Sequence, residues 1–141
     1  MPDDQATRDL LRNARTIAVV GLSDKPDRDS NEVARYLESV GYDVIPVNPN
    51  LTEDLGHRSF PSVTAIPAGR QVDIVDIFRR SDQVAPSVTE AVARGVGTIW
   101  MQLGVRDEAS AALARAHGIR VYQDRCIMQE HRRLRVPPIS K

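Results

Sequence analysis

The sequence has little of several features on which common protein classes depend. A single cysteine, Cys126, excludes a disulfide framework within the chain. No apolar run approaches the roughly 20 residues that a membrane-spanning helix needs. The polar amino terminus also lacks a signal-peptide pattern. We therefore expect a cytosolic (cytoplasmic) protein without membrane association.

Net charge and aromatic side chains are equally scarce. The 19 lysines and arginines balance 19 aspartates and glutamates, so the chain as a whole has no field that would attract nucleic acid. Aromatic residues make up 4% of the sequence, too few for a platform on which single-stranded bases stack. We expect no nucleic-acid partner, and any basic site must be local.

Short apolar runs alternate with helical patterns of about ten residues in a chain long enough for one domain. This alternation predicts right-handed βαβ units. The fold class is therefore α/β, a single-domain, Rossmann-like doubly wound parallel sheet in three layers (αβα). The predicted strands lie near 17–20, 43–49, 72–78, 98–104 and 119–122, and the predicted helices near 4–14, 30–40, 84–94 and 107–117.

Several local expectations refine this picture. Helix 4–14 should pack at the sheet edge. Because proline cannot donate to the ladder, we expect Pro46 either in an edge-like position or at a ladder site where its nitrogen needs no partner. Residues 50–71 are irregular, with a short strand near 57–60 and a helical turn near 62–66. The helix at 107–117 should face the sheet with its apolar side chains Ala109, Ala112, Leu113 and Ala116. Trp100 and Met101 are expected in the core.

The first predicted strand opens into a polar, basic loop before a helix. Gly21 allows a sharp turn and a close approach of a ligand to the backbone. Asp29 or Ser30 can cap the helix, and Asp29 with Glu32 has the spacing of a capping box. Free N–H groups at a helix start bind anions, and Lys25 and Arg28 add positive charge. The loop therefore predicts a phosphorylated ligand.

A second strand, 72–78, ends in a similar basic turn, Arg79-Arg80-Ser81. In open parallel sheets, ligands bind at the carboxyl ends of strands where the strand order reverses. We expect Arg79 to face this rim and Arg80 to face solvent, because adjacent extended residues point to opposite sides. The rim should collect the turns that follow Val20, Val47, Phe78, Leu103 and Tyr122.

The glycine fingerprint of dinucleotide-binding folds is absent. Gly21 is followed by no further glycine until Gly41, and the acidic residue expected after the second strand is replaced by Asn48. These differences disfavour NAD. The basic residues instead suit a ligand with more phosphate charge.

Several ordered motifs resemble the stand-alone bacterial and archaeal CoA-binding domain proteins, over roughly residues 8–131. They are Gly21-Leu22-Ser23-x-x-Pro26-x-Arg28-x-Ser30, residues 41–49 (GYDVIPVNP), Phe78-Arg79-Arg80-Ser81, residues 100–104 (WMQLG) and Asp124-Arg125-Cys126. That family is similar to the CoA-binding domain of the succinyl-CoA synthetase alpha subunit. The resemblance implies a sheet with strand order 3-2-1-4-5-6.

The resemblance also implies a ligand, coenzyme A or an acyl-CoA. Its phosphates are expected against Ser23, Lys25, Arg28 and Arg79, and its adenosine near Asn48-Pro49. Cofactor-binding residues are expected at Gly21, Ser23, Lys25, Arg28, Ser30, Val47, Asn48, Pro49, Phe78, Arg79, Val84, Gln102, Gly104 and Cys126. The binding domain is expected at 1–131, followed by a flexible or docked tail at 132–141.

We expect a binding protein rather than an enzyme, because the synthetase depends on a phosphorylated histidine in a following domain and on a partner subunit. His57, His117 and His131 match no such site and lack metal-site spacing; they are expected at the surface. Two alternatives stay open: a component of an acyl-CoA ligase that awaits a partner, and an NAD(P)-type regulator. Homodimerisation is also open, and Cys126 is either a small buried residue or a thiol within reach of CoA.

Overall fold

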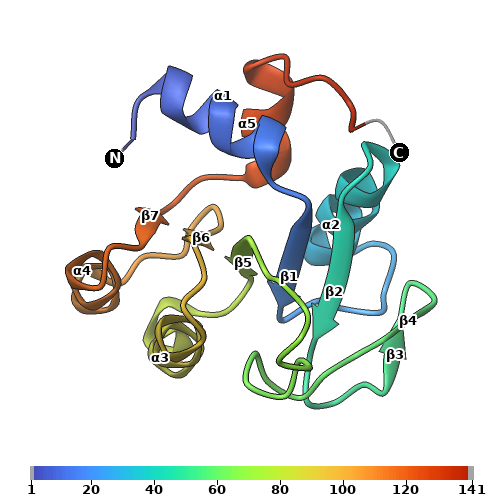
Figure 1. Ribbon diagram of the computed structural model, residues 1–141. Helices are drawn as coiled ribbons and strands as arrows, with labels where there is room; N and C mark the ends of the chain where they lie inside the picture. Colours follow the sequence, from blue (N-terminus) through green and yellow to red (C-terminus); the bar gives the residue numbers. More distant parts are fainter. Residues whose placement is uncertain (1, 140–141) are drawn as a thin grey trace.

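A computed structural model describes residues 2–139, and a five-stranded parallel sheet lies at its centre (Figure 1). The strand order is β2-β1-β5-β6-β7. Their bounds are Thr16–Val20 for β1, Asp43–Val47 for β2, Ile74–Ile77 for β5, Thr98–Met101 for β6 and Arg120–Tyr122 for β7. These strands are buried on both faces, which explains their apolar, β-branched runs. The predicted Rossmann-like α/β fold is confirmed.

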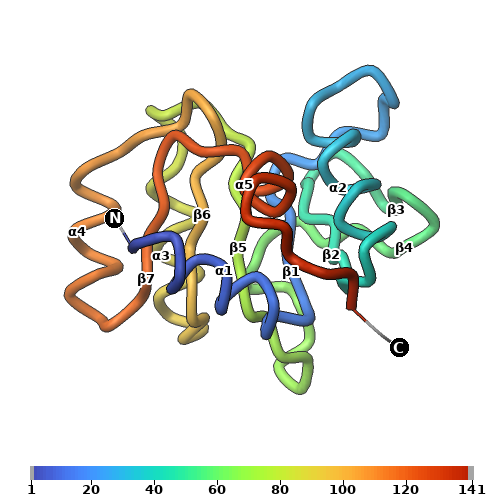
Figure 2. Tube along the Cα trace, turned by 90° about the horizontal axis from the view of Figure 1, so that it is seen from above, coloured from blue at the N-terminus to red at the C-terminus, as the bar shows by residue number. Residues whose placement is uncertain are grey.

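Helices cover both faces of the sheet and enclose two cores (Figures 1 and 2). On one face lie α1 (Asp4–Asn13), α2 (Asp29–Ser39) and α5 (Ile127–Arg133), and on the other lie α3 (Ala85–Arg94) and α4 (Glu108–Ala116). A short 3-10 helix, η1 (Ser81–Gln83), precedes α3. Trp100 and Met101 are fully buried as predicted, one in each core.

Two helix predictions need correction. Helix α1 lies across the face shared with α2 and α5, where Leu11 is fully buried, and not at the sheet edge. Helix α4 turns Ser110, Ala111 and Ala114 inward and leaves Leu113 42% exposed. Its alanine-rich sequence offers no dominant apolar stripe, so small side chains that allow close approach to the sheet decide its orientation.

The segment after β2 contains a small hairpin, β3 (Glu53–Asp54) and β4 (His57–Arg58). Beyond it, Phe60 forms a single parallel bridge with Val47. The third strand in the order implied by the resemblance is thus reduced to this bridge on the outer side of β2. The Pro46 carbonyl oxygen accepts a hydrogen bond from Phe60 N (3.0 Å), on the side of β2 that faces away from β1. The N and C=O of one strand residue point to the same side, so the Pro46 nitrogen lies on this outer side too, where the sheet requires no N–H donor.

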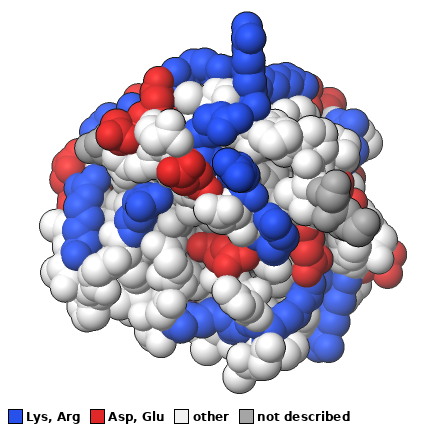
Figure 3. All heavy atoms as spheres, turned by 45° about the horizontal axis from the view of Figure 1, so that its top comes forward, with Lys and Arg blue, Asp and Glu red and all other residues white. Residues whose placement is uncertain are grey.

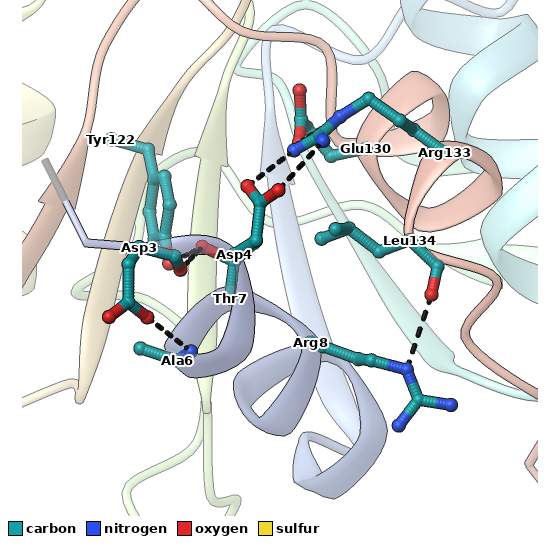
Figure 4. Close-up of polar contacts among 9 residues, drawn as sticks. All are labelled: Asp3, Asp4, Ala6, Thr7, Arg8, Tyr122, Glu130, Arg133 and Leu134. Atoms are coloured by element: carbon teal, nitrogen blue, oxygen red, sulfur yellow. Dashed lines mark hydrogen bonds and ion pairs between the residues drawn. The ribbon is translucent and has the colours of Figure 1, made fainter.

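The carboxyl-terminal segment docks against the start of the chain. Helix α5 continues without a break across residues 131 and 132, where the binding domain was expected to end and the tail to begin. After the helix, the Leu134 carbonyl oxygen accepts a hydrogen bond from Arg8 Nε at 3.2 Å (Figure 4). The Arg133 guanidinium bridges Asp4 and Glu130, and Thr7 Oγ1 lies 2.7 Å from Tyr122 Oη. These contacts hold α5 over the sheet. Among residues 2–139, no helix has the length and apolar character to cross a membrane.

Candidate functional site

Two adjoining hollows lie at the carboxyl ends of β1, β5 and β6. The loop hollow follows β1 and is lined by Gly21, Ser23, Lys25, Asp27, Arg28, Asp29, Ser30 and Phe78. The α2–α5 hollow, of about 400 Å³, is lined by Asp29, Glu32, Val33, Phe78, Arg79, Arg80, Gln102, Leu103, Val105, Cys126, Met128 and Gln129. Asp29 and Phe78 line both, so the two hollows form one continuous rim site.

A glycine is required at position 21 because the loop that follows β5 comes very close to the backbone there. Its φ is +82°, and a Cβ placed on it would lie 2.1 Å from the Phe78 carbonyl oxygen. Phe78 N donates to Val20 O and Gly21 N donates to Val47 O, both at 2.8 Å, so the three strand ends are locked together. The space that a side chain at this position needs is therefore occupied by protein backbone.

The loop between β1 and α2 is fixed by its own polar side chains. Ser23 N donates to Ser30 Oγ (3.0 Å), Asn31 Nδ2 donates to Ser23 O (2.9 Å) and Lys25 N donates to Ser23 Oγ (3.1 Å). Both serine oxygens thus accept from backbone and retain a proton to donate. The predicted capping box is wrong: Arg28 is the N-cap residue, without a side-chain cap, because Ser30 is engaged with the loop.

Three basic side chains at the rim have no ion-pair partner among the described residues: Lys25, Arg28 and Arg79. Arg79 Nε lies 3.5 Å from the position of a Cβ on Gly21, so this side chain reaches from the β5 loop toward the β1 loop. Arg80 is exposed and pairs with Asp82 at 2.8 Å. Arg79 and Arg80 both line the α2–α5 hollow, and they differ in that Arg80 is exposed and paired.

Acidic side chains share the rim with these cations. Asp27 lines the loop hollow, Glu32 lines the α2–α5 hollow and Asp29 lines both. On the face seen in Figure 3, basic and acidic side chains are likewise interspersed. The site is therefore not a strong anion trap, and its preference depends on where individual groups lie.

Other predicted site residues do not line the hollows but form hydrogen bonds that hold the rim loops in place. Asn48 Nδ2 donates to Leu22 O (3.0 Å), which ties the end of β2 to the first loop. Gly104 N donates to Asp124 Oδ1 (2.7 Å), which fixes the turn after β6. Neither hollow is lined by Val47, Asn48, Pro49, Val84 or Gly104, and Val47 and Val84 are buried in the core.

Gln102 and Cys126 both line the α2–α5 hollow. Gln102 is 4% exposed, and its Oε1 accepts from Ile127 N at 3.0 Å, which anchors the start of α5. Cys126 is 7% exposed at the same helix start. Leu103, expected at the rim, also lines this hollow, together with Glu32, Val33, Val105, Met128 and Gln129, which were not predicted as site residues. Met128 and Gln129 lie on α5, a helix that was not predicted from the sequence.

Two ionisable side chains are buried away from the hollows. Asp76 in β5 is fully buried, neither carboxylate oxygen has a partner in the described part of the chain, and burial raises its pKa well above the usual range. His131 is 2% exposed, so its predicted surface position is wrong; its Nδ1 lies 2.7 Å from Tyr36 Oη. Burial and the Arg132 charge lower the His131 pKa. His57 and His117 are exposed as predicted.

No group of His, Cys, Asp or Glu residues within 2–139 is arranged to hold a metal ion.

A family model described as a CoA binding domain matches residues 15–132. The chain belongs to this CoA-binding domain family. The resemblance drawn from the motifs is thereby confirmed, and the match supports a CoA-related binding module.

Two proteins of about the same length are similar to this chain in sequence or in fold. YneT, an uncharacterized protein of Bacillus subtilis strain 168, is 35% identical over 92% of this chain and 95% of its own length. A hypothetical protein of Pyrococcus horikoshii OT3 superposes with a TM-score of 0.91 at 37% identity, over 94% of this chain and 92% of that one.

A larger enzyme contains a related part. The dinucleotide-forming acetyl-coenzyme A synthetase 1 of Ca. Korarchaeum cryptofilum, in a structure with phosphate and ADP, superposes with a TM-score of 0.68 at 28% identity. The match covers 81% of this CoA-binding domain but 27% of the synthetase chain. The likeness therefore concerns one part of that enzyme.

Proposed function

We propose that this protein binds coenzyme A or an acyl-CoA at the rim and performs no chemical step by itself. The observation that carries the proposal is the continuity of the two hollows through Phe78: one has polar and charged walls, and the other adds aliphatic side chains. CoA has the same division, with phosphates at one end and a less polar pantetheine arm at the other.

In this proposal the phosphates lie against Lys25, Arg28 and Arg79, which have no ion-pair partner in the described chain. The hydroxyls of Ser23 and Ser30 add donors, because their oxygens already accept from backbone N–H groups. Asn48 and Pro49, at the end of β2, border the loop on the side assigned to adenosine. The pantetheine arm then crosses Phe78 toward Gln102 and Cys126.

The non-catalytic part of the proposal is supported by the lining of the site. No histidine lines either hollow, so the rim offers no imidazole to carry a phosphoryl group. Incubation of the protein alone with acetate, CoA and ATP should therefore yield no acetyl-CoA. Product formation by the protein alone would contradict a purely binding role.

Calorimetry tests the ligand. CoA should bind more tightly than dephospho-CoA and NAD, because its additional 3′-phosphate supplies charge for the cations that a bare pyrophosphate leaves without a partner. Mass spectrometry of the native protein should show a bound CoA species. NAD binding more tightly than CoA would overturn the proposal.

A further inference from the structure

The α2–α5 hollow has apolar surface beyond what the loop hollow provides. Val33, Leu103, Val105, Cys126 and Met128 line it from α2, α5 and the turns after β6 and β7, and none of them lines the loop hollow. A ligand that enters through the loop hollow therefore meets aliphatic and sulfur-containing side chains only after it passes Phe78.

Leu103 is the most informative of these residues. Within residues 2–139, only Leu103 and Leu113 are large apolar side chains with high exposure, 62% and 42%. Leu103 lies in a turn fixed on either side: Gly104 N donates to Asp124 Oδ1 (2.7 Å), and Gln102 Oε1 accepts from Ile127 N (3.0 Å). The fold thus holds an apolar side chain in water at the mouth of a hollow, where a ligand group would cover it.

The charges in the same hollow disfavour an anionic ligand tail. The carboxylates of Asp29 and Glu32 line it from α2 and have no ion-pair partner among the described residues. Of the two arginines there, Arg80 already pairs with Asp82 (2.8 Å), and Arg79 is assigned to phosphate. The carboxylate of a dicarboxylic acyl group would therefore be repelled by Asp29 and Glu32 and would find no guanidinium in the hollow that Asp82 or the phosphates leave unpaired.

We infer that the α2–α5 hollow holds the acyl group of an acyl-CoA and selects uncharged aliphatic acyl groups over dicarboxylic ones. The inference rests on the proposed function and adds the class of thioester. Burial of each further methylene against Leu103 and its neighbours strengthens binding by about fourfold, the equivalent of ~0.8 kcal/mol per methylene.

Titration calorimetry with CoA, acetyl-CoA, butyryl-CoA and succinyl-CoA tests the inference. Butyryl-CoA should bind about fifteenfold more tightly than acetyl-CoA, because it has two more methylenes to bury, and succinyl-CoA should bind more weakly than butyryl-CoA. Equal affinities for CoA and butyryl-CoA, or a preference for succinyl-CoA, would overturn the inference while CoA binding itself stands. Failure of all four ligands to bind would overturn the proposed function instead.

Two variants locate the effect. Leu103→Ser should reduce the ratio of the affinity for butyryl-CoA to the affinity for CoA, whereas Leu113→Ser, which changes an exposed leucine on α4, should alter neither affinity. Glu32→Gln should reduce the difference in affinity between butyryl-CoA and succinyl-CoA, because it removes a negative charge from the hollow. An unchanged preference in Leu103→Ser, with the variant folded by circular dichroism, would show that the acyl group lies elsewhere.

Discussion

Arginine has opposite roles in two parts of this molecule. On α3, Arg94 donates hydrogen bonds at 2.7–3.3 Å to the carbonyl oxygens of Val63, Ile66, Pro67 and Arg70. Glu90, one helical turn earlier, accepts from Val63 N at 2.8 Å. At the rim, Arg79 makes no hydrogen bond or ion pair with any described residue.

The difference separates polar groups that hold the fold from those that remain available to a ligand. The segment 61–71 has little regular structure, yet side chains of α3 form hydrogen bonds with several of its backbone N–H and C=O groups. These bonds fix the path of the segment. The rim cations are held near one another by glycine turns and by serine and asparagine side chains while their own donors stay unused.

The largest effect is expected at Gly21, where backbone geometry creates the rim. Gly21→Ala should destabilise the protein by about 3 kcal/mol or more, because a Cβ would meet Phe78 O at 2.1 Å in addition to the strain of a positive φ. Gly56→Ala is the matched control, since φ is +75° there but no atom lies within 4 Å; it should cost about 1 kcal/mol. Urea unfolding of both variants measures the difference, and equal losses would mean that the rim tolerates a side chain.

The next effect concerns the partnered arginine. Arg94→Ala should lower the free energy of unfolding by about 2–3 kcal/mol, because the carbonyl groups of the 61–71 loop lose a charged donor. The CoA affinity of the folded variant should not change. Arg115→Ala, an exposed arginine on α4, serves as the control. A loss of CoA affinity in Arg94→Ala at full stability would contradict the division.

The unpartnered arginine should behave in the opposite way. Arg79→Ala should weaken CoA about ten- to hundredfold, since a charge-assisted contact to phosphate is worth ~1.5–3 kcal/mol, and leave stability nearly unchanged. Arg80→Ala is the matched control, because its guanidinium is exposed and paired with Asp82. Calorimetry that finds equal losses in both variants, or none in Arg79→Ala, would remove Arg79 from the site.

Periodicity and turn chemistry predicted the sheet, its rim and most helix bounds. Strands buried on both faces have apolar runs that are hard to mistake, and Gly41, Gly95 and Gly118 end helices with positive φ. The resemblance added the order of strands. The third strand of that order is reduced to the Val47–Phe60 bridge, at the end of the short strand expected near 57–60. Its pairing with β2 could not be predicted, because a single bridge leaves no periodic signal.

The errors share one physical cause, which is that tertiary contacts override local patterns. His131 has the sequence context of a basic, exposed helix, yet it packs between Tyr36 and Tyr42. The Ser30 hydroxyl accepts from Ser23 N, seven residues away, and so is not the helix cap that its position suggested. The hollow between α2 and α5 depends on the docking of two helices that are far apart in the sequence.

Two aspartates, the half-buried Asp73 and the fully buried Asp76, extend the comparison to carboxylates. Asp73 Oδ2 accepts from Arg15 N and Thr16 N, both at 2.9 Å, whereas the carboxylate of Asp76 has no partner among residues 2–139. Asp73→Asn should therefore destabilise the protein and Asp76→Asn should stabilise it at pH 7, by about 1–2 kcal/mol in each case. A loss of stability in Asp76→Asn at pH 7 would mean that this carboxylate has a partner in solution.

The pH dependence gives the sign of the Asp76 effect. Because burial raises its folded-state pKa, the folded protein binds more protons than the unfolded chain above the unfolded pKa of about 3.9. Stability is then lost as pH rises from that value toward the folded-state pKa. Denaturation curves from pH 4 upward should show the advantage of Asp76→Asn growing with pH and vanishing near pH 4.

The smallest effect is expected at Asp29, the carboxylate that lines both hollows. Asp29→Asn should tighten CoA about two- to fivefold at low salt, because an exposed like charge is removed from beside the phosphates. The gain should shrink as salt screens the rim. Stability should fall slightly, since Asp29 lies in the first turn of α2 and favours the helix dipole.

The opposite signs of these two changes identify the role of Asp29. Glu108→Gln is the control, because Glu108 occupies the first turn of α4 and lines neither hollow; it should lower stability without altering CoA affinity. If Asp29→Asn weakens CoA, the carboxylate contributes to binding, for example by orienting Arg28 or Lys25. The phosphates would then lie elsewhere along the rim than the unpartnered cations indicate.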